Sequence, residues 1–332
     1  MYNDAGSVTS EASTLAGEGA GQEEGVEGLS KAEQWEDKVR EALELAGQKS
    51  AGTRLKGLEA LCTGLTRRYA PDFVSTQQLT TCDLVERAVK KGRGGEVVAG
   101  ARLAVLLALQ LPDPETVYTE LRPTLAGLAG DRTASLVSRA AAATSLAGLC
   151  FLGGGEMAEV VGVMGVLEGI FSTSRTGGDI PPDMAALHSA ALEGWSLLLT
   201  LQSSGEVYRQ ADRTITLFRG VLGSSDVELR ITAGEAIALV LEFAYDYDEE
   251  FMPAGMAELV EAVRQLATDS NKSRSKKDRK EQRSSFRDIL RGVEEGDPPS
   301  VKVKFDKEVL YLDCWYKKLQ YDWFCKVRSS GD

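Results

Sequence analysis

The residues best suited to chemistry lie in one basic segment, NKSRSKKDRKEQRSSFRDIL, which runs from Asn271 to Leu290. It holds eight Lys or Arg residues against three acidic residues, in a chain whose formal net charge is -12. Clustered positive charge attracts the phosphates of a nucleic acid, with a strong dependence on salt. The candidate contact residues for RNA, a ribosome or an acidic partner are Lys272, Arg274, Lys276, Lys277, Arg279, Lys280 and Arg283.

Two other interpretations of this segment compete with phosphate binding. It could be a nuclear localisation patch. It could also be the start of a helix whose bases pair with Asp278, Glu281 and acidic loops. Recognition of RNA bases would need aromatic side chains that stack on them, and only Phe286 lies close to the positive charges. Any RNA binding is therefore expected to depend weakly on base sequence.

A search of the sequence for catalytic or cofactor-binding motifs yields little. The one histidine, His188, lies on the apolar face of a helical pattern, which is typical of a packed, hydrogen-bonded core histidine rather than a general base. The sequence has no clustered Cys/His ligands of the zinc type and no Gly-rich phosphate loop between a strand and a helix. We therefore expect a non-enzyme that uses no metal, no cofactor and no small-molecule substrate.

The cysteine pattern indicates a reducing compartment. Five cysteines lie far apart, none forms a C-x-x-C pair, and their number is odd: Cys62, Cys82, Cys150, Cys314 and Cys325. Such thiols are typical of a cytosolic or nuclear protein. Cys62 and Cys150 lie in Ala/Leu-rich helical patterns, where a thiol is usually a small core residue. The first residues show neither the basic nor the apolar region of a signal peptide.

Composition predicts a helical protein with an acidic tail. Hydrophobic residues make up 43% of the chain and aromatic residues only 7%, which suits closely packed helices. No apolar run reaches the roughly 18 residues of a membrane span, so we expect no membrane contact. Residues 1–37 carry nine acidic residues and one lysine, a net charge of −8 that leaves −4 for the rest. We expect residues 1–34 to form a disordered acidic tail, because they contain few apolar side chains.

The middle of the chain repeats with an even period. Five helical segments place small residues three and six positions on, and an aliphatic residue seven positions on, from residues 54, 98, 139, 185 and 230. In the fourth copy the first of these positions is His188. Offsets of three and seven select one helix face. The spacings of 44, 41, 46 and 45 residues lie inside the roughly 40–47-residue period of HEAT and armadillo repeats.

Matching partner helices lie between these segments, separated by Pro- and Gly-rich breaks. Gly92 is a candidate helix C-cap, and Asp131 and Asp226 are candidate N-caps. We therefore predict an all-α fold in which residues 35–270 form an armadillo/HEAT-like helical repeat domain. Helix pairs of this kind stack into a curved solenoid whose concave surface usually receives a partner.

The chain changes character at its C-terminal end. Residues 271–300 are expected to form a basic loop and a short amphipathic helix, and residues 301–332 a β-hairpin followed by a terminal helix. The apolar positions of the terminal helix are about four apart: Trp315, Leu319, Trp323 and Val327. We predict that the hairpin and helix form a small C-terminal cap over the last repeat.

Three stretches resemble the interferon-related developmental regulator family: LRITAGEAIALVLEFAYDYDEEF, LATDSNKSRSKKDRKEQRSSFRDIL and VKFDKEVLYLDCWYKKLQYDWF. The similarity is close from about Leu229 to Val327 and weaker, though colinear, back to about Ala51; its most specific part runs from Lys276 to Arg287. The resemblance implies an armadillo-like domain without enzymatic activity, in regulators of differentiation that act in transcriptional co-regulation. The family is also linked to ribosome binding and translational repression. Its members typically continue into a Lys/Arg-rich C-terminal region, which this sequence, ending in RSSGD, does not contain.

Two function classes follow. The preferred one is a non-enzymatic scaffold that binds regulatory protein complexes on its solenoid, in the nucleus and the cytoplasm. The alternative is a translational repressor that binds a ribosome or RNA through residues 272–283.

Overall fold

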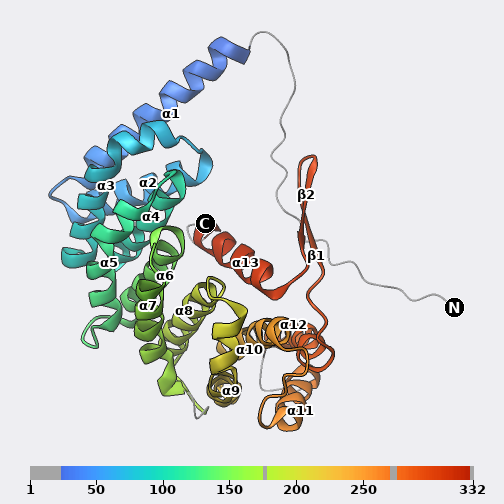
Figure 1. Ribbon diagram of the computed structural model, residues 1–332. Helices are drawn as coiled ribbons and strands as arrows, with labels where there is room; N and C mark the ends of the chain where they lie inside the picture. The colour runs from blue at the N-terminus through green and yellow to red at the C-terminus, as the bar shows by residue number, and fades with distance from the viewer. Residues whose placement is uncertain (1–23, 175–177, 270–274, 330–332) are drawn as a thin grey trace.

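The computed structural model describes residues 24–174, 178–269 and 275–329 (Figure 1). Side chains are described from residue 31 onward. The helices are α1 (Glu24–Ala46), α2 (Ala51–Arg67), α3 (Pro71–Lys91), α4 (Gly95–Gln110), α5 (Glu115–Gly130), α6 (Leu136–Gly153), α7 (Met157–Phe171), the 3-10 turn η1 (Ser172–Ser174), α8 (Pro182–Leu199), α9 (Ser204–Val221), α10 (Val227–Tyr247), α11 (Met256–Thr268), α12 (Lys276–Glu295) and α13 (Trp315–Ser329). The strands are β1 (Val301–Phe305) and β2 (Glu308–Leu312).

The helices pack as consecutive pairs, α1 with α2 through to α11 with α12. The second helices of the pairs also stack on one another, from α2 through α4, α6, α8 and α10 to α12. Figure 1 shows the pairs following an arc, with α13 lying inside it. The predicted fold class, an all-α armadillo/HEAT-like solenoid with a C-terminal hairpin and helix, is confirmed.

The repeated sequence pattern marks the inner helices. Its aliphatic positions are all buried: Leu61, Val105, Leu146, Leu192 and Ile237. A small residue is needed at Gly57, because a Cβ there would lie 2.2 Å from the backbone nitrogen of Ala46 in α1. Ala60 is the exception to the pattern, since it is exposed on the first pair of the stack.

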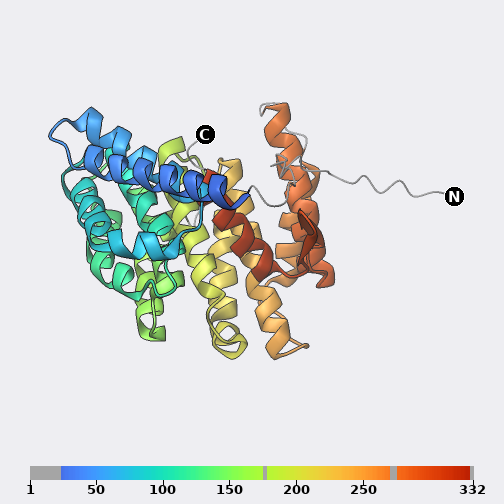
Figure 2. The same cartoon turned by 90° about the horizontal axis from the view of Figure 1, so that it is seen from above.

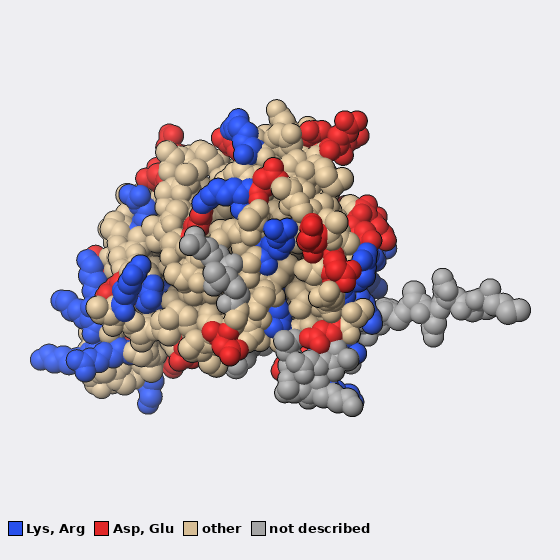
Figure 3. Space-filling view, turned by 90° about the horizontal axis from the view of Figure 1, so that it is seen from below, with Lys and Arg blue, Asp and Glu red and all other residues tan. Residues whose placement is uncertain are grey.

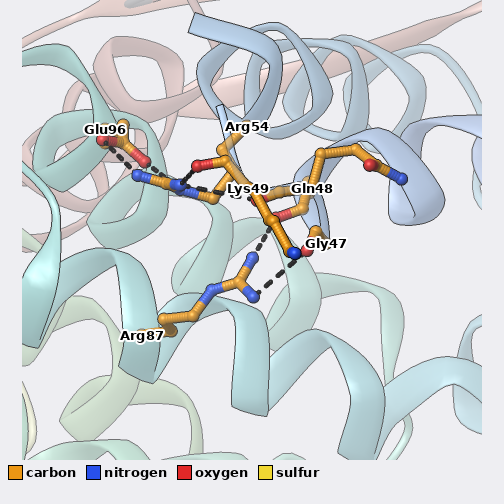
Figure 4. Close-up of polar contacts among 7 residues, drawn as sticks. Gly47, Gln48, Lys49, Arg54, Arg87 and Glu96 are labelled. Carbon is orange, nitrogen blue, oxygen red and sulfur yellow. Dashed lines mark hydrogen bonds and ion pairs between the residues drawn. The ribbon is translucent and has the colours of Figure 1, made fainter. Parts of the chain in front are cut away.

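Arginines secure the ends of the outer helices. Arg54 donates from Nη1 to the carbonyl of Lys49 (2.6 Å) and from Nε to Oε1 of Glu96 in α4 (2.7 Å) (Figure 4). Arg87 of α3 donates to the carbonyl of Ala46. The last carbonyls of a helix lack partners within the helix. The Arg87 bond therefore satisfies the last carbonyl of α1 and holds this helix end against α3. Arg54, in α2, joins its own helix and the preceding loop to α4.

The same position of the repeat is used again in later pairs. Arg139 donates to the carbonyl of Ala129 at the end of α5 (3.0 Å), and Arg230 donates to the carbonyl of Ser224 after α9 (2.5 Å). Arg230 also donates to Oε1 of Gln282 in α12 (2.5 Å). The side chain of Arg230 is among the largest that are fully buried. The first-turn arginine thus joins each of these inner helices to the preceding outer one.

Three cap predictions have mixed outcomes. Gly92 is the C-cap of α3, as predicted. Asp226 caps α10, because its Oδ1 accepts from the Leu229 nitrogen at 2.9 Å. The prediction for Asp131 is wrong: its carboxylate accepts from the backbone nitrogen and the hydroxyl of Thr133, and Ser135 caps α6 instead.

The predicted tail ends earlier than expected. Residues 1–23 lie outside the described residues, but α1 begins at Glu24, so the last part of the segment 1–34 is helical. The acidic residues of this stretch suit the first turn of a helix, where the helix dipole favours negative charge. Extension of a helix that is already anchored also adds one hydrogen bond per residue fixed, without a new nucleation cost.

The C-terminal segment forms the hairpin and helix that the sequence predicts. β1 pairs antiparallel with β2, with Val301 opposite Leu312 and Phe305 opposite Glu308. The two-residue turn contains Asp306 at a positive φ of 48°. Trp315 lies against Gly292 of α12, as expected for a cap on the last repeat. However, α13 then continues across α10, α8 and α4, obliquely to the stack (Figure 2).

Two described segments are apolar and long enough to cross a membrane by length and composition alone: Leu136–Gly153 and Met157–Ser174. Core helices of packed domains have the same character. α6 contacts α4, α5, α7 and α8, and α7 contacts α5, α6 and α8.

Candidate partner-binding surfaces

The concave face of the solenoid holds α13. The side chains that anchor this helix are buried: Trp315, Trp323 and Val327. The ring of Trp323 sits directly over Gly148 of α6, where a Cβ would lie 2.3 Å from its Cη2 atom. Phe324 meets Phe151 edge to face, with ring centroids 5.7 Å apart. The surface that sequence analysis left open for a partner is thus partly covered by the chain itself.

Carboxylates on the inner helices bind the polar side of α13. Three of them are seven residues apart on one face of α10, namely Glu228, Glu235 and Glu242, and the fourth is Glu193 of α8. Glu242 accepts from the backbone nitrogens of Trp315 (2.6 Å) and Tyr316 (3.1 Å), which are free donors at the helix start. This acidic row is not among the residues that the sequence predicts, although its spacing of seven residues was a usable signal.

Two lysines of α13 meet this row. Lys318 lies 2.8 Å from Glu235, and Lys326 lies 2.7 Å from Glu193 and 3.6 Å from Glu228. Burial raises the pKa of Glu193 above its ordinary value, and the Lys326 ammonium offsets part of that rise. Burial opposes protonation of both lysines, but the carboxylates outweigh it, so the pKa of each lysine is raised. The lysines are therefore charged at neutral pH.

The C-terminal end of α13 is bound by the N-terminal repeats. Arg102 of α4 donates from Nε to the carbonyl of Val327 (2.9 Å) and from Nη2 to that of Arg328. Arg328 in turn reaches the carbonyl of Thr66 at the end of α2 (3.4 Å). Contacts thus join residues more than 220 positions apart.

The basic segment lies mainly on α12. Ser275 caps this helix by accepting from the Asp278 nitrogen at 3.1 Å. Five of the seven candidate residues are described: Lys276, Lys277 and Lys280 are exposed, whereas Arg279 and Arg283 are half-buried. Lys272 and Arg274 lie outside the described residues.

The structure extends this basic surface along the helix. Five cations, three or four residues apart, occupy one face of α12: Lys276, Lys280, Arg283, Arg287 and Arg291. The opposite flank buries Gln282, Phe286, Ile289 and Val293 in the stack. Arg287 and Arg291 are not among the contact residues predicted from the sequence, although their spacing follows the same helical period. We call this set the α12 basic stripe.

Charge is unevenly distributed on the rest of the surface. Figure 3 shows Lys and Arg gathered at the left of the lower face, on the side where α3 and α5 lie in Figure 1, with Asp and Glu spread over the remainder. The acidic net charge of -12 therefore does not make the surface uniformly acidic.

The β-hairpin presents apolar side chains to solvent. Five of its residues have exposed fractions between 40% and 54%: Val301, Phe305, Val309, Leu310 and Tyr311. Phe305 touches Tyr321 of α13 edge to face, and Leu312 is buried. A two-stranded hairpin rarely supports such side chains alone. Apolar patches of this kind mark protein-interaction sites. The strand register places Val301, Phe305 and Leu310 on one face of the hairpin and Val309 and Tyr311 on the other. We call the first three residues the hairpin patch.

His188 is a core residue, as predicted. It is 4% exposed, and its Nδ1 lies 2.6 Å from the hydroxyl of Ser174, with Nε2 3.4 Å from that of Thr173. Burial lowers its pKa, so the ring is neutral at physiological pH. Cys62 and Cys150 are buried, and the cysteines are unpaired in the described part of the chain. Within the same residues, no group of three His, Cys, Asp or Glu side chains could hold a metal ion.

These features define an α-solenoid with surfaces suited to macromolecular partners. Comparison with known families then identifies it: the family model described as Interferon-related developmental regulator (IFRD) matches residues 5–294, and the chain belongs to this family. The resemblance found in the sequence is confirmed. Membership supports a role as a developmental regulator, and the family's members are named as regulators rather than enzymes.

Curated relatives are more than a third identical to this chain over the residues that align. Interferon-related developmental regulator 1 of Sus scrofa is 38% identical over 307 residues, which cover 90% of this chain and 68% of the relative. Interferon-related developmental regulator 2 of Mus musculus is 38% identical over 316 residues, covering 93% and 72%. A solved engineered protein aligns over 78% of this chain and 97% of its own at 13% identity and a TM-score of 0.48, a likeness too weak to support a conclusion.

Proposed function

We propose that the chain is a non-enzymatic regulatory scaffold that acts in transcriptional co-regulation during differentiation, by binding partner proteins in the nucleus and cytoplasm. The observation that supports it is the hairpin patch, whose three apolar side chains share one face and stay 40% to 51% exposed. Removing apolar surface from water stabilises association by roughly 25 cal/mol per Å². A regulatory protein complex that covers this patch gains that energy.

Affinity purification from extract of differentiating cells tests the proposal, with bound proteins identified by mass spectrometry. Phe305→Ser with Leu310→Ser should remove transcriptional co-regulator subunits that the unchanged chain captures. Tyr69→Ser with Leu79→Ser is the matched control, because these two side chains are 65% and 67% exposed elsewhere and should not matter. Capture of the same subunits by the hairpin variant would refute the role of the patch.

A second function, ribosome or RNA binding in translational repression, is supported by the α12 basic stripe. Arg283 of the stripe is half-buried, and its other four side chains are exposed: Lys276, Lys280, Arg287 and Arg291. Phosphate binding needs such charge and no fixed geometry, and its affinity falls with log salt in proportion to the contacts made. The two functions use different surfaces of the same chain.

Binding to purified ribosomes and to single-stranded RNA across a salt series tests this second function. Changing Lys276, Lys280 and Arg287 to Glu should reduce the slope of log affinity against log salt by about 2, since each phosphate contact on a single strand contributes about 0.7. The matched control reverses three exposed hairpin lysines, Lys302, Lys304 and Lys307. Equal slopes for the two variants would exclude the stripe, and no binding at low salt would exclude the function.

A further inference from the structure

We propose that α13 is an internal ligand of the concave face, and that the same groove binds an amphipathic helix of a partner protein in its place. That partner helix carries aromatic and Lys side chains at the α13 spacing. The inference rests on the proposed protein-binding function and names a site and a partner chemistry for it.

The groove recognises a helix through a defined pattern. Its apolar contacts come from Trp315, Leu319, Trp323 and Val327, which recur every four residues and so lie along one side of α13. A helix that lies in a groove is usually held through anchors at such offsets. The close approach of Trp323 to Gly148 makes a flat aromatic ring the required central anchor.

Charge complementarity specifies the rest of the partner. Four groove carboxylates face α13: Glu193, Glu228, Glu235 and Glu242. Two lysines of α13 form ion pairs with three of these carboxylates. Lys318 pairs with one carboxylate, and Lys326 pairs with two. The groove therefore has more negative charge than α13 neutralises with its side chains. Glu242 accepts backbone N–H groups, which any helix start supplies. A more basic helix fits this groove better than α13.

The packing of α13 in the groove leaves buried polar atoms without hydrogen bonds and cavities beside the helix. Among the described residues, the buried Nε1 of Trp315 and the buried hydroxyl of Ser196 have no hydrogen-bond partner. Cavities flank Trp323 on both sides: Val98 and Ala141 line one of them, and Ser196 lines the other. A buried donor without an acceptor weakens the contact that buries it. These defects favour exchange for a helix that fills the cavities.

The chain preceding α13 lets it move as a unit. The hairpin contacts α13 through β2, and α12 ends at Glu295 with Gly296 as its C-cap, whose φ of 70° is in the left-handed region. Pro298 and Pro299 follow, so the connection to the solenoid is a short non-helical link. Most of the buried core residues lie on the helix pairs themselves, and α13 adds Trp315, Trp323 and Val327 to the same core. Undocking of α13 therefore need not unfold the stack.

A binding assay with a fluorescein-labelled peptide of the α13 sequence, Asp313–Ser329, tests the inference on the full-length chain. The peptide should bind weakly to the unchanged chain, because its own α13 fills the groove. Trp323→Ala with Lys326→Glu weakens the internal helix but leaves the groove intact. If the groove is open less than a tenth of the time in the unchanged chain, this variant should bind the peptide about 10-fold or more tightly.

Charge reversal in the groove supplies the decisive control. Glu235→Lys, added to the weakened variant, should abolish peptide binding, and a peptide with Lys318→Glu should restore it. Glu249→Lys, at an exposed position outside the groove, should change nothing. Circular dichroism of every variant verifies that the helices persist, and the peptide that restores binding proves the Glu235→Lys groove is folded.

Each other outcome contradicts the inference. Equal peptide affinity for the unchanged and weakened chains would place binding elsewhere, and no binding to the weakened chain would exclude displacement. Light scattering that shows a dimer of the weakened variant would assign the groove to a second copy of the chain. Loss of peptide binding together with retained capture of co-regulator subunits through the hairpin patch would refute this inference and leave the proposed function standing.

Discussion

Replacement of Gly148 by Ala tests the seat of α13 directly. In α6 the added methyl group would meet three ring atoms of Trp323, at 2.3, 3.0 and 3.2 Å. Carbon atoms at rest are about 3.5–4.0 Å apart, so the ring or the helix must move. The substitution also removes a glycine from a helix interior, which stabilises that helix by about 1 kcal/mol.

A second glycine separates these two effects. Gly162 lies in the middle of α7, exposed, and an added methyl group there would meet no atom within 4 Å. Gly162→Ala should therefore gain about 1 kcal/mol from helix propensity alone. Overpacking of a buried contact costs about 1–3 kcal/mol, so Gly148→Ala should be less stable than Gly162→Ala by that amount. Because both changes are Gly→Ala in a helix, the difference isolates the contact with Trp323.

Urea denaturation of both variants, followed by circular dichroism, measures this difference as a free energy of unfolding. The double change Gly148→Ala with Trp323→Ala should show coupling, since the clash disappears with the ring. A Gly148→Ala chain as stable as Gly162→Ala would show that Trp323 does not rest on α6. The reasoning about the concave face would then fail.

Three further predictions concern a cap, the histidine and the thiols. Asp226→Ala should lower the free energy of unfolding in urea by about 1 kcal/mol, because the Leu229 nitrogen loses its acceptor; an unchanged value would deny the cap. Burial lowers the pKa of His188 below 6.5, so the unfolded chain binds that proton more readily. Stability should therefore fall as the pH drops through about 6.5, and a His188→Gln chain that showed the same fall would contradict this. Iodoacetamide at pH 8 should modify exposed Cys325 first, as read by peptide mass spectrometry. Burial raises the thiol pKa to about 12 in Cys62, to about 12 in Cys82 and to about 11 in Cys150. Early modification of any of these three thiols would contradict their placement in the core.

The solenoid could be predicted from sequence because its rule is local. Small and aliphatic residues at offsets of three, six and seven determine which helix face packs, and their recurrence gives the stack. Gly57 and Ala233 occupy the same offset of three in different pairs, and both are buried. The hairpin was predictable for the same reason, since alternation and a two-residue turn are properties of neighbouring residues.

The location of α13 could not be predicted in this way. The spacing of Trp315 and Trp323 shows that the helix has an apolar face, but not which surface receives it. The answer depends on residues such as Gly148 and Arg102, which are far away in sequence. The N-cap prediction for Asp131 was wrong for a related reason. A carboxylate before a helix can accept hydrogen bonds from the residues of its own turn, here Thr133, and leave the first turn of the helix uncapped by it.

The basic segment could be predicted from the composition of the sequence, whereas the arrangement of its charges along α12 is known only from the structure. Charge density identified Lys272 through Arg283, and the register of α12 shows that Arg287 and Arg291 continue the same stripe. The stretch that looked most distinctive in the sequence is thus one end of a longer surface.

A helical solenoid without cross-links behaves as a spring, because each pair touches only its neighbours. Here α13, 15 residues long and so about 22 Å from end to end, spans the arc as a rigid strut. Glu242 holds one end and Arg102 the other. The arc between α4 and α10 is therefore braced by one short rod, and a helix that replaced α13 in the groove would brace the arc in its place.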